Sequence, residues 1–252
     1  MPNAHTHLAA VADLLNQPEL AATVPWLNSD EVQSAFLLGA IGPDARAVSG
    51  QPREATHFFN IPPEDNVLAQ DVMLRSYPIL HPAVSLTPAR AAFVAGYITH
   101  LVMDQTWLEV VVMPGLFIDG LTWGTRHPNW RLYSILMTWL EYRAAAQLSK
   151  QTAASLAHAQ PDSWLPFVQD RHLVQWRDHV VNMIRTEGAQ RTSVIFAQTN
   201  NLSAQELEDI VLSEARMAEQ VYPTVAPERL AEFETTTARR SLAAVLNYLA
   251  DT

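Results

Sequence analysis

The segment from Thr87 to Val112 most strongly constrains how this chain can fold. It opens with a hydroxyl residue followed by proline, as the first turn of a helix often does, and its apolar residues recur at helical spacing. The same apolar face carries His100 and Asp104, which are four residues apart and therefore lie one turn from each other. Gly96 lies one turn earlier, where a small residue lets another backbone come close. Since a carboxylate on a buried face needs a cation or hydrogen bonds to compensate its charge, this helix predicts a polar site inside an apolar core.

Helical periodicity extends over the rest of the chain, and no segment shows the alternation typical of a strand. Ser203 and Glu206 fit a capping box at the start of one predicted helix. Residues 42–66 and 113–130 are rich in proline or in glycine and aromatic residues, and we expect loops there. The predicted fold class is all-α, with helices near residues 8–15, 29–41, 88–112, 128–148, 164–187, 203–222 and 227–250.

Charge and cysteine content exclude several functions. The chain has 16 basic and 26 acidic residues, a formal net charge of −10, so we expect no nucleic acid partner. It has no cysteine, and a bound metal ion would therefore need His, Asp, Glu or backbone ligands. No apolar run approaches the roughly 20 residues that span a bilayer, and the first residues do not resemble a signal peptide. We expect a soluble, cytoplasmic protein without a transmembrane segment.

Residues of the metal-ligand types are spread over the first part of the chain, at His5, His7, Asp44, His57, His100 and Asp104. Asp44 follows a Gly-Pro pair, and is either a carboxylate aimed by a rigid turn or part of an ordinary turn. His57 precedes two phenylalanines and is either a ligand or a structural residue. His5 and His7 are two residues apart, so a regular helix would direct them about 200° from each other and only one could reach a given ion.

In their order along the chain, these residues resemble the zinc-dependent phospholipase C family, which is related to the fungal single-strand nucleases. The matching segments are His7-Leu8, Phe36 to Asp44, Thr56-His57-Phe58 and Gly96 to Asp104, all within residues 5–107. The resemblance implies a multi-helix phospholipase C/nuclease-like domain, and the helical pattern of the last hundred residues predicts a helical C-terminal extension. We interpret residues 1–252 as a single all-α domain, with a metal-binding core at 1–150 and a helical extension at 151–252. The polar stretch 149–162 is either a linker or a seam between them.

The resemblance also implies a set of metal ligands. In the family, the counterparts of Asp44, His57, His100 and Asp104 share one zinc ion, and that of Asp104 bridges to a second ion. The counterpart of His7 holds this second ion, together with the amine and carbonyl of the mature N-terminus. Since the chain has neither a leader nor an early tryptophan, we expect His5 to take the place of that terminal group.

The chain departs from the family at the third zinc ion. Residues 110–113 are Val-Val-Val-Met where the family has a further histidine, and no histidine is followed by glutamate four residues later. We therefore expect one or two Zn²⁺ ions, with another divalent metal as an alternative. His127 either approaches the site from its loop or lies at the surface, and we interpret His172 and His179 as packing or surface residues.

The function implied by the resemblance is that of a metal-dependent phosphoesterase. It would hydrolyse phosphodiesters as a phospholipase C does, with Asp44 orienting or deprotonating a water molecule and a phosphoester small molecule or lipid head group as the substrate. The alternative is a metal-stabilised helical binding or interaction module without catalysis, which the missing third-ion ligands favour. An HD-type phosphohydrolase is disfavoured because the chain has no adjacent His-Asp pair. The sequence leaves the oligomeric state open.

Overall fold

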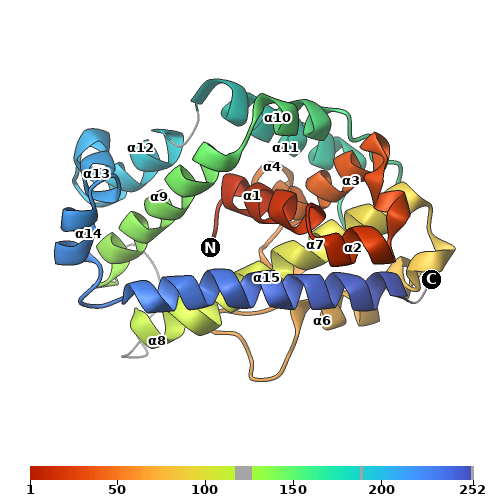
Figure 1. The fold of residues 1–252 in the computed structure, drawn as a ribbon, viewed down its shortest axis with the longest axis horizontal. Helices are drawn as coiled ribbons and strands as arrows, with labels where there is room; N and C mark the ends of the chain where they lie inside the picture. Colours follow the sequence, from red (N-terminus) through yellow and green to blue (C-terminus); the bar gives the residue numbers. More distant parts are fainter. Residues whose placement is uncertain (117–126, 188–189, 251–252) are drawn as a thin grey trace.

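The computed structural model describes residues 1–116, 127–187 and 190–250, and over these ranges it is helical without a strand, which confirms the all-α class (Figure 1). The α-helices are α1 (Ala4–Leu15), α2 (Pro18–Thr23), α3 (Asp30–Ile41), α4 (Arg46–Ser49), α5 (Glu54–His57), α6 (Ala69–Ser76), α7 (Pro88–Trp107), α8 (Met113–Gly115), α9 (Trp130–Gln147), α10 (Lys150–Ala157), α11 (Asp170–Asn182), α12 (Gln190–Thr199), α13 (Ala204–Val211), α14 (Glu214–Gln220) and α15 (Pro227–Ala250). Among the described residues, no helix combines the length and the apolar composition needed to cross a membrane.

Helix α7 forms the centre of the molecule. Thr87 caps it by accepting a hydrogen bond from the Arg90 amide, as the hydroxyl-proline start predicts. Every residue from Ala91 to Trp107 is buried, so neighbours surround the helix instead of covering one stripe. Beyond Trp107 the chain continues as a π-helical turn, Leu108–Val112, which the apolar periodicity does not distinguish from α-helix.

The crossing of α3 and α7 depends on two glycines. A Cβ atom on Gly39 would lie 2.0 Å from the carbonyl oxygen of Phe93. A Cβ atom on Gly96 would lie 2.1 Å from the carbonyl oxygen of Phe36. The two backbones are therefore in direct contact, and only glycine permits this approach. The close approach expected at Gly96 is confirmed, with α3 as the helix that approaches.

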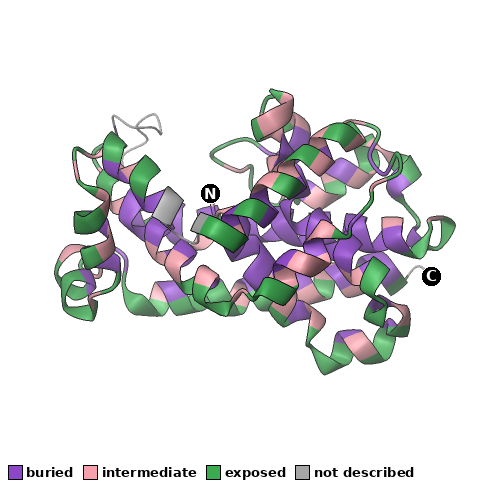
Figure 2. Cartoon of the chain, turned by 90° about the horizontal axis from the view of Figure 1, so that it is seen from above, coloured by how far each residue is buried: buried purple, intermediate pink, exposed green. Residues whose placement is uncertain are grey.

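The remaining long helices enclose this pair. Helix α15 lies along α7, where the rings of Phe233 and Trp107 meet edge to face with centroids 5.0 Å apart. Helix α1 packs against both α3 and α9. Viewed from above, buried residues concentrate in the helices that run through the middle of the molecule (Figure 2). The C-terminal residues thus contact the helix that carries His100 and Asp104.

Several predicted boundaries are wrong, because short polar segments that look like loops are helical. The stretch 42–66 contains the 3-10 turn η2 (Gly42–Ala45) as well as α4 and α5. The stretch 149–162 contains α10, whose capping box pairs Ser149 with Thr152. Serine and threonine favour both turns and helix starts, and sequence alone does not separate the two.

Two further boundaries concern the C-terminal half. The capping box of Ser203 and Glu206 is confirmed, but the segment 203–222 forms two helices, α13 and α14, with Ser213 capping the second. Helix α12 was not predicted. Within the predicted loop 113–130, residues 117–126 lie outside the described part of the chain.

Candidate metal centre

Five of the six candidate ligands come together at the centre of the molecule. His7 comes from α1, Asp44 from the turn that follows α3, His57 from the last position of α5, and His100 and Asp104 from α7. Their ligand atoms form two groups, His7/His100/Asp104 and Asp44/His57/His100, and within each group the atoms lie within 4.8 Å of one another. Because His100 belongs to both groups, these residues form one cluster, which we call the His/Asp cluster.

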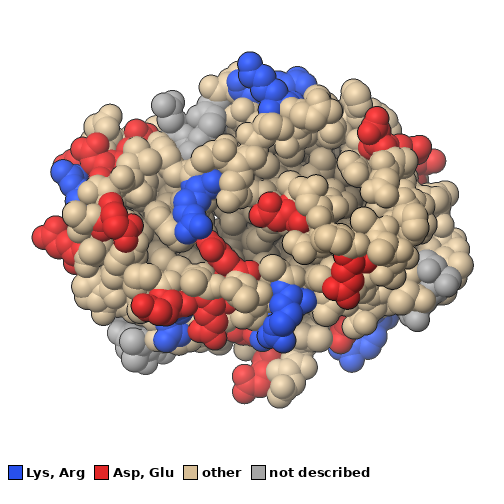
Figure 3. All heavy atoms as spheres, viewed as in Figure 1, with Lys and Arg blue, Asp and Glu red and all other residues tan. Residues whose placement is uncertain are grey.

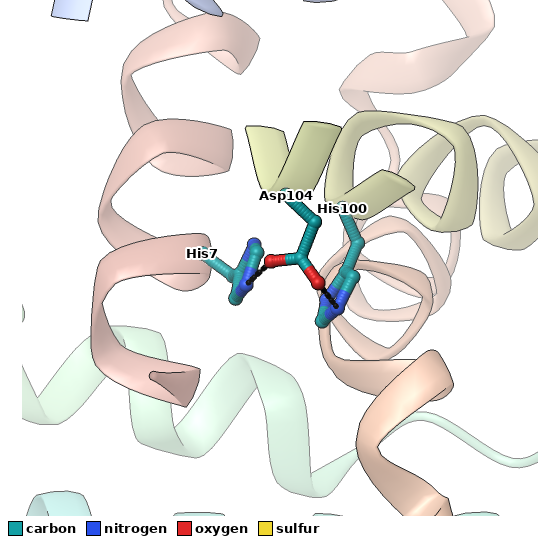
Figure 4. Close-up of side chains that lie close together, drawn as sticks. All are labelled: His7, His100 and Asp104. Carbon is teal, nitrogen blue, oxygen red and sulfur yellow. Dashed lines mark ion pairs between the residues drawn. The ribbon is translucent and has the colours of Figure 1, made fainter. Parts of the chain in front are cut away.

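Asp104 links the residues of this cluster. Its two carboxylate oxygens point to different rings, Oδ1 to Nε2 of His7 at 3.4 Å and Oδ2 to Nε2 of His100 at 3.7 Å (Figure 4). The rings of His7 and His100 stack with centroids 3.7 Å apart. Asp104 is fully buried, so its charge needs compensation from its neighbours.

The distances around His57 fit ligands of a single ion. Nε2 of His57 lies 3.6 Å from Oδ1 of Asp44 and 3.5 Å from Oδ2 of Asp104. Nε2 of His100 lies 3.4 Å from Nε2 of His57. Two atoms that each lie about 2.1 Å from one tetrahedral ion are about 3.4 Å apart. The separations are thus close to the edges of a zinc coordination tetrahedron, although they are long for direct hydrogen bonds.

The other ring nitrogens are held by the surrounding chain. Nδ1 of His100 donates to the carbonyl oxygen of Ala40 at 2.8 Å, which leaves the lone pair of Nε2 facing the cluster. Nδ1 of His57 lies 2.9 Å from the hydroxyl of Thr56. Metal-binding histidines are commonly oriented in this way by a hydrogen bond on the second nitrogen. The crossing of α3 and α7 therefore also sets the orientation of His100.

Two buried atoms of the cluster, Nε2 of His7 and Oδ1 of Asp104, face each other at 3.4 Å, but neither makes a hydrogen bond. Buried polar atoms without partners are rare in folded proteins and unfavourable by about 1–3 kcal/mol each. A cation between these two atoms would satisfy both. The cluster therefore fits a divalent metal ion in its donor types, in its spacing and in its unpartnered atoms.

The protonation states also suit a metal site. Burial acts to raise the pKa of Asp104, but the three neighbouring imidazoles outweigh it and hold this pKa well below its usual range. Burial, reinforced by His7, lowers the pKa of His100 to about 3. Burial opposes the charge of Asp44 too, yet contact with His57 and the other imidazole lowers its pKa to about 2. At neutral pH the carboxylates are charged and His100 is neutral, as metal coordination requires.

Arg53 is a member of the site that sequence reasoning missed. Its Nη2 donates to Oδ2 of Asp104 at 3.1 Å, and its Nη1 donates to the carbonyl oxygen of Phe59 at 3.2 Å. The guanidinium also stacks over the Phe59 ring, 4.3 Å from its centroid. Arg53 precedes His57 by four residues, which places both side chains on one face if the stretch is helical. Because we expected a loop here, this spacing did not indicate that Arg53 joins the site. The guanidinium gives the buried carboxylate a permanent positive neighbour.

His5 belongs to neither group of ligand atoms. Its Nδ1 pairs with Oε1 of Glu141 on α9 at 2.5 Å, and both side chains are buried. This placement agrees with the angular separation expected from His7. Burial lowers the pKa of the Met1 amino group to about 6, although the charge of Asp104 acts to raise this pKa. The Met1 amine contacts the hydroxyl of Tyr133.

His127 and His179 both have packing or hydrogen-bonding partners in the structure. His127 is buried, with Nδ1 accepting from the Asn129 amide, so the surface interpretation is wrong. His179 stacks on Trp176 and lines the same cavity as Asp44. The seven-residue spacing of His172 and His179 did not indicate this position.

A cavity of about 410 Å³ opens onto Asp44. It lies between the N-terminal segment and α4, α11 and α12, with Trp176, His179 and Met183 among its lining residues. The side chain of Asp44 is 28% exposed, whereas the other four members of the cluster are almost completely buried. A small ligand in this cavity would therefore meet Asp44 first, and its volume is in the range of small-molecule sites, about 300–1,000 Å³.

The fold and the site define an all-α protein with a buried His/Asp cluster next to a cavity. Comparison of the chain with models of known protein families, with curated proteins and with solved structures gives no match.

Proposed function

We propose that the protein is a metal-dependent phosphoesterase of the phospholipase C type. His7, Asp44, His57, His100 and Asp104 would hold one or two divalent ions, with zinc as the first candidate. The observation that carries the proposal is the spacing of Asp44, His57, His100 and Asp104, whose neighbouring ligand atoms lie 3.4–3.7 Å apart. The resemblance in the order of the ligands supports the choice of reaction.

Each residue has a task in such a reaction. When bound, a divalent ion lowers the pKa of water and offsets charge on a phosphoryl group. Asp44 faces the cavity as a carboxylate and accepts a hydrogen bond from water, which orients that water toward a substrate. Its pKa of about 2 makes it a weak base, so orientation is its main contribution. His57 and His100 keep Nε2 directed inward through the bonds to Thr56 and Ala40.

The cavity beside Asp44 limits the substrate. A volume of about 410 Å³ suits a phosphoester small molecule or the head group of a lipid. Trp176 offers an aromatic face there, and His179 offers a polar ring. We propose that the substrate enters on this side.

The test combines metal content with activity. Metal per chain is measured by elemental analysis for the wild type, His100→Ala and the control His158→Ala, whose residue lies at the exposed end of α10. All three proteins are assayed on bis(p-nitrophenyl) phosphate and phosphatidylcholine. We expect the wild type and His158→Ala to bind metal and hydrolyse a phosphodiester, and His100→Ala to lose both properties.

Other outcomes separate the alternatives. Metal lost in His100→Ala, without hydrolysis by any of the proteins, would identify a metal-stabilised binding module and refute the enzyme. A wild-type protein that binds no zinc, manganese or magnesium would refute the metal centre itself. A circular dichroism spectrum of each variant shows whether loss of metal follows from loss of the fold.

A further inference from the structure

A second cavity, of about 760 Å³, shares no lining residue with the cavity at Asp44. Residues of α1, α7, α9 and α15 line it, and we call it the four-helix cavity. Figure 3 shows a hollow at the centre of the face that α15 crosses in Figure 1, with acidic and basic side chains around its rim. The lining residues of the cavity include His7, which also belongs to the His/Asp cluster.

The walls of the four-helix cavity are mostly apolar. Leu14, Met103, Leu140, Phe233 and Leu242 contribute large side chains, and alanines of α1 and α9 leave the space between them. A volume of about 760 Å³ lies within the range of small-molecule sites. Such walls favour an alkyl chain, because each buried methylene contributes to binding through the hydrophobic effect.

Besides Nε2 of His7, two polar atoms of the lining residues have no hydrogen-bond partner. The hydroxyls of Thr6 and Thr237 are buried and make no hydrogen bond, and both residues line the cavity. Thr6 is 8% exposed and Thr237 is 4% exposed, so bulk water does not satisfy these groups. A ligand with a hydroxyl group would satisfy them, because a hydroxyl both donates and accepts hydrogen bonds.

The charges of the lining balance one another. Arg143 pairs with Glu234 across the rim at 3.1 Å, and Asp13 and Arg239 contribute one charge of each sign. A charged head group would lose hydration without gaining a net opposite charge. The lining therefore favours an uncharged ligand over a fatty acid anion or a cationic amphiphile.

We propose that the four-helix cavity binds an uncharged single-chain lipid with a free hydroxyl group, of which a long-chain alcohol is the simplest form. The hydroxyl bonds to Thr237, and the alkyl chain packs between Leu14, Met103 and Phe233. This site does not depend on the proposed phosphoesterase function.

The first test uses the wild-type chain and a series of alcohols. Titration calorimetry with 1-octanol, 1-nonanol and 1-decanol is expected to show saturable binding that tightens about fourfold per methylene. Octanoate and decanoate carry a negative charge that the alcohols lack. We expect each of these carboxylates to bind at least about tenfold more weakly than the alcohol of equal chain length. Absence of saturable binding would overturn the proposal, and equal binding of the carboxylates would overturn the uncharged class of ligand.

Variants locate the binding to this cavity. Ala10 lines the cavity, whereas Ala12 on the same helix does not. Ala10→Trp is expected to abolish decanol binding, and Ala12→Trp to retain it. Equal binding by both variants would place the ligand elsewhere and refute the proposal.

A gentler pair of variants tests the hydrogen bond. Thr237→Val removes the unpartnered hydroxyl at nearly constant volume, and it is expected to weaken decanol binding about threefold to tenfold. Thr235→Val is the control, because its hydroxyl donates to the carbonyl oxygen of Ala231 on the exposed side of α15. If Ala10→Trp fails to fold, the two valine variants still test the proposal. Equal decanol affinities of Thr237→Val and Thr235→Val would contradict the assigned hydrogen bond. Each titration is repeated after treatment with a chelator, which separates the outcome from that of the metal centre.

Discussion

His100 connects the fold to the chemistry of the site through its two ring nitrogens. Nδ1 donates to the backbone of α3, and Nε2 faces His57 and Asp104. Burial keeps this ring neutral, with a pKa of about 3 compared with 6.5 for an exposed histidine. The same shift links the stability of the metal-free protein to pH.

The first prediction concerns this linkage. Between pH 6.5 and about 3 the unfolded chain protonates His100 and the folded chain does not, so the free energy of unfolding decreases as pH falls through this window. Asp44 further lowers the free energy of unfolding at lower pH, between its ordinary pKa of 3.8 and its pKa of about 2 in the folded chain. Urea denaturation with a chelator present, at pH 7, 5.5 and 4.5, measures the slope. His100→Gln, which retains an amide donor for Ala40, should flatten the slope; an unchanged slope would contradict the assignment.

Arg53 gives the second prediction. Its guanidinium lies 3.1 Å from the carboxylate that a metal ion would share, so like charges compete for Asp104. Arg53→Gln is expected to tighten Zn²⁺ binding by roughly tenfold through the loss of this repulsion. Equilibrium dialysis measures the affinity, and Arg75→Gln on the exposed side of α6 is the control. Weaker zinc binding in Arg53→Gln would show instead that the guanidinium organises the site.

The candidate ligands could be predicted in part because ligand chemistry needs particular side chains in a particular order. His7, Asp44, His57, His100 and Asp104 come together as expected, although binding of metal by them stays a prediction. Arg53 and His179 could not be found in this way. An arginine is common on any surface, and only the contact with a buried carboxylate distinguishes this one.

At the scale of elements, the crossing of α3 and α7 gives the third prediction. Gly96→Ala places a methyl group 2.1 Å from a carbonyl oxygen of α3, so we expect a loss of about 3 kcal/mol in the free energy of unfolding. The control is Gly115→Ala, where the nearest atom is a movable side-chain methyl of Val225 at 3.1 Å and the loss should be less than about 1 kcal/mol. Equal losses in the two variants, measured by chemical denaturation, would contradict the tight crossing.

Helices were predictable where their ends carry a clear signal. The start of α7 at Thr87 and that of α13 at Ser203 agree with their caps. Helix α10 was missed although Ser149 caps it, because its residues are mostly small and polar and lack an apolar stripe of helical spacing. The contacts between helices, and both cavities, involve residues far apart in the chain, which local patterns do not report.

At the scale of the whole molecule, the last helix is part of the core. Helix α15 covers α7, and the ring of Phe233 packs against that of Trp107, which is fully buried. Val245, Tyr248 and Leu249 of α15 are also buried, and the hydroxyl of Tyr248 donates to the carbonyl oxygen of Leu80. The last helix of the segment 151–252, which we interpret as a helical extension, thus packs directly against the central helix.

The fourth prediction follows from this packing. A chain that ends at Val225 would expose the apolar face of α7, so it should lose the cooperative unfolding transition of the full chain. Thermal denaturation followed by circular dichroism tests this. Phe233→Ala in the full chain, with an expected loss of about 3–5 kcal/mol, shows whether the contact with Trp107 carries the effect. A truncated chain with a sharp transition close to that of the full chain would mean that residues 1–225 fold independently.

The paired glycines of α3 and α7 have a consequence for how this protein can change over evolutionary time. Each lies against a backbone carbonyl of the opposite helix, so a side chain at either position forces the helices apart and removes the reason for a glycine at the other. Moving the helices also shifts Ala40 away from His100. We therefore expect Gly39, Gly96 and His100 to be conserved or replaced together. A homologue in which one of them is replaced should lack the buried site as well.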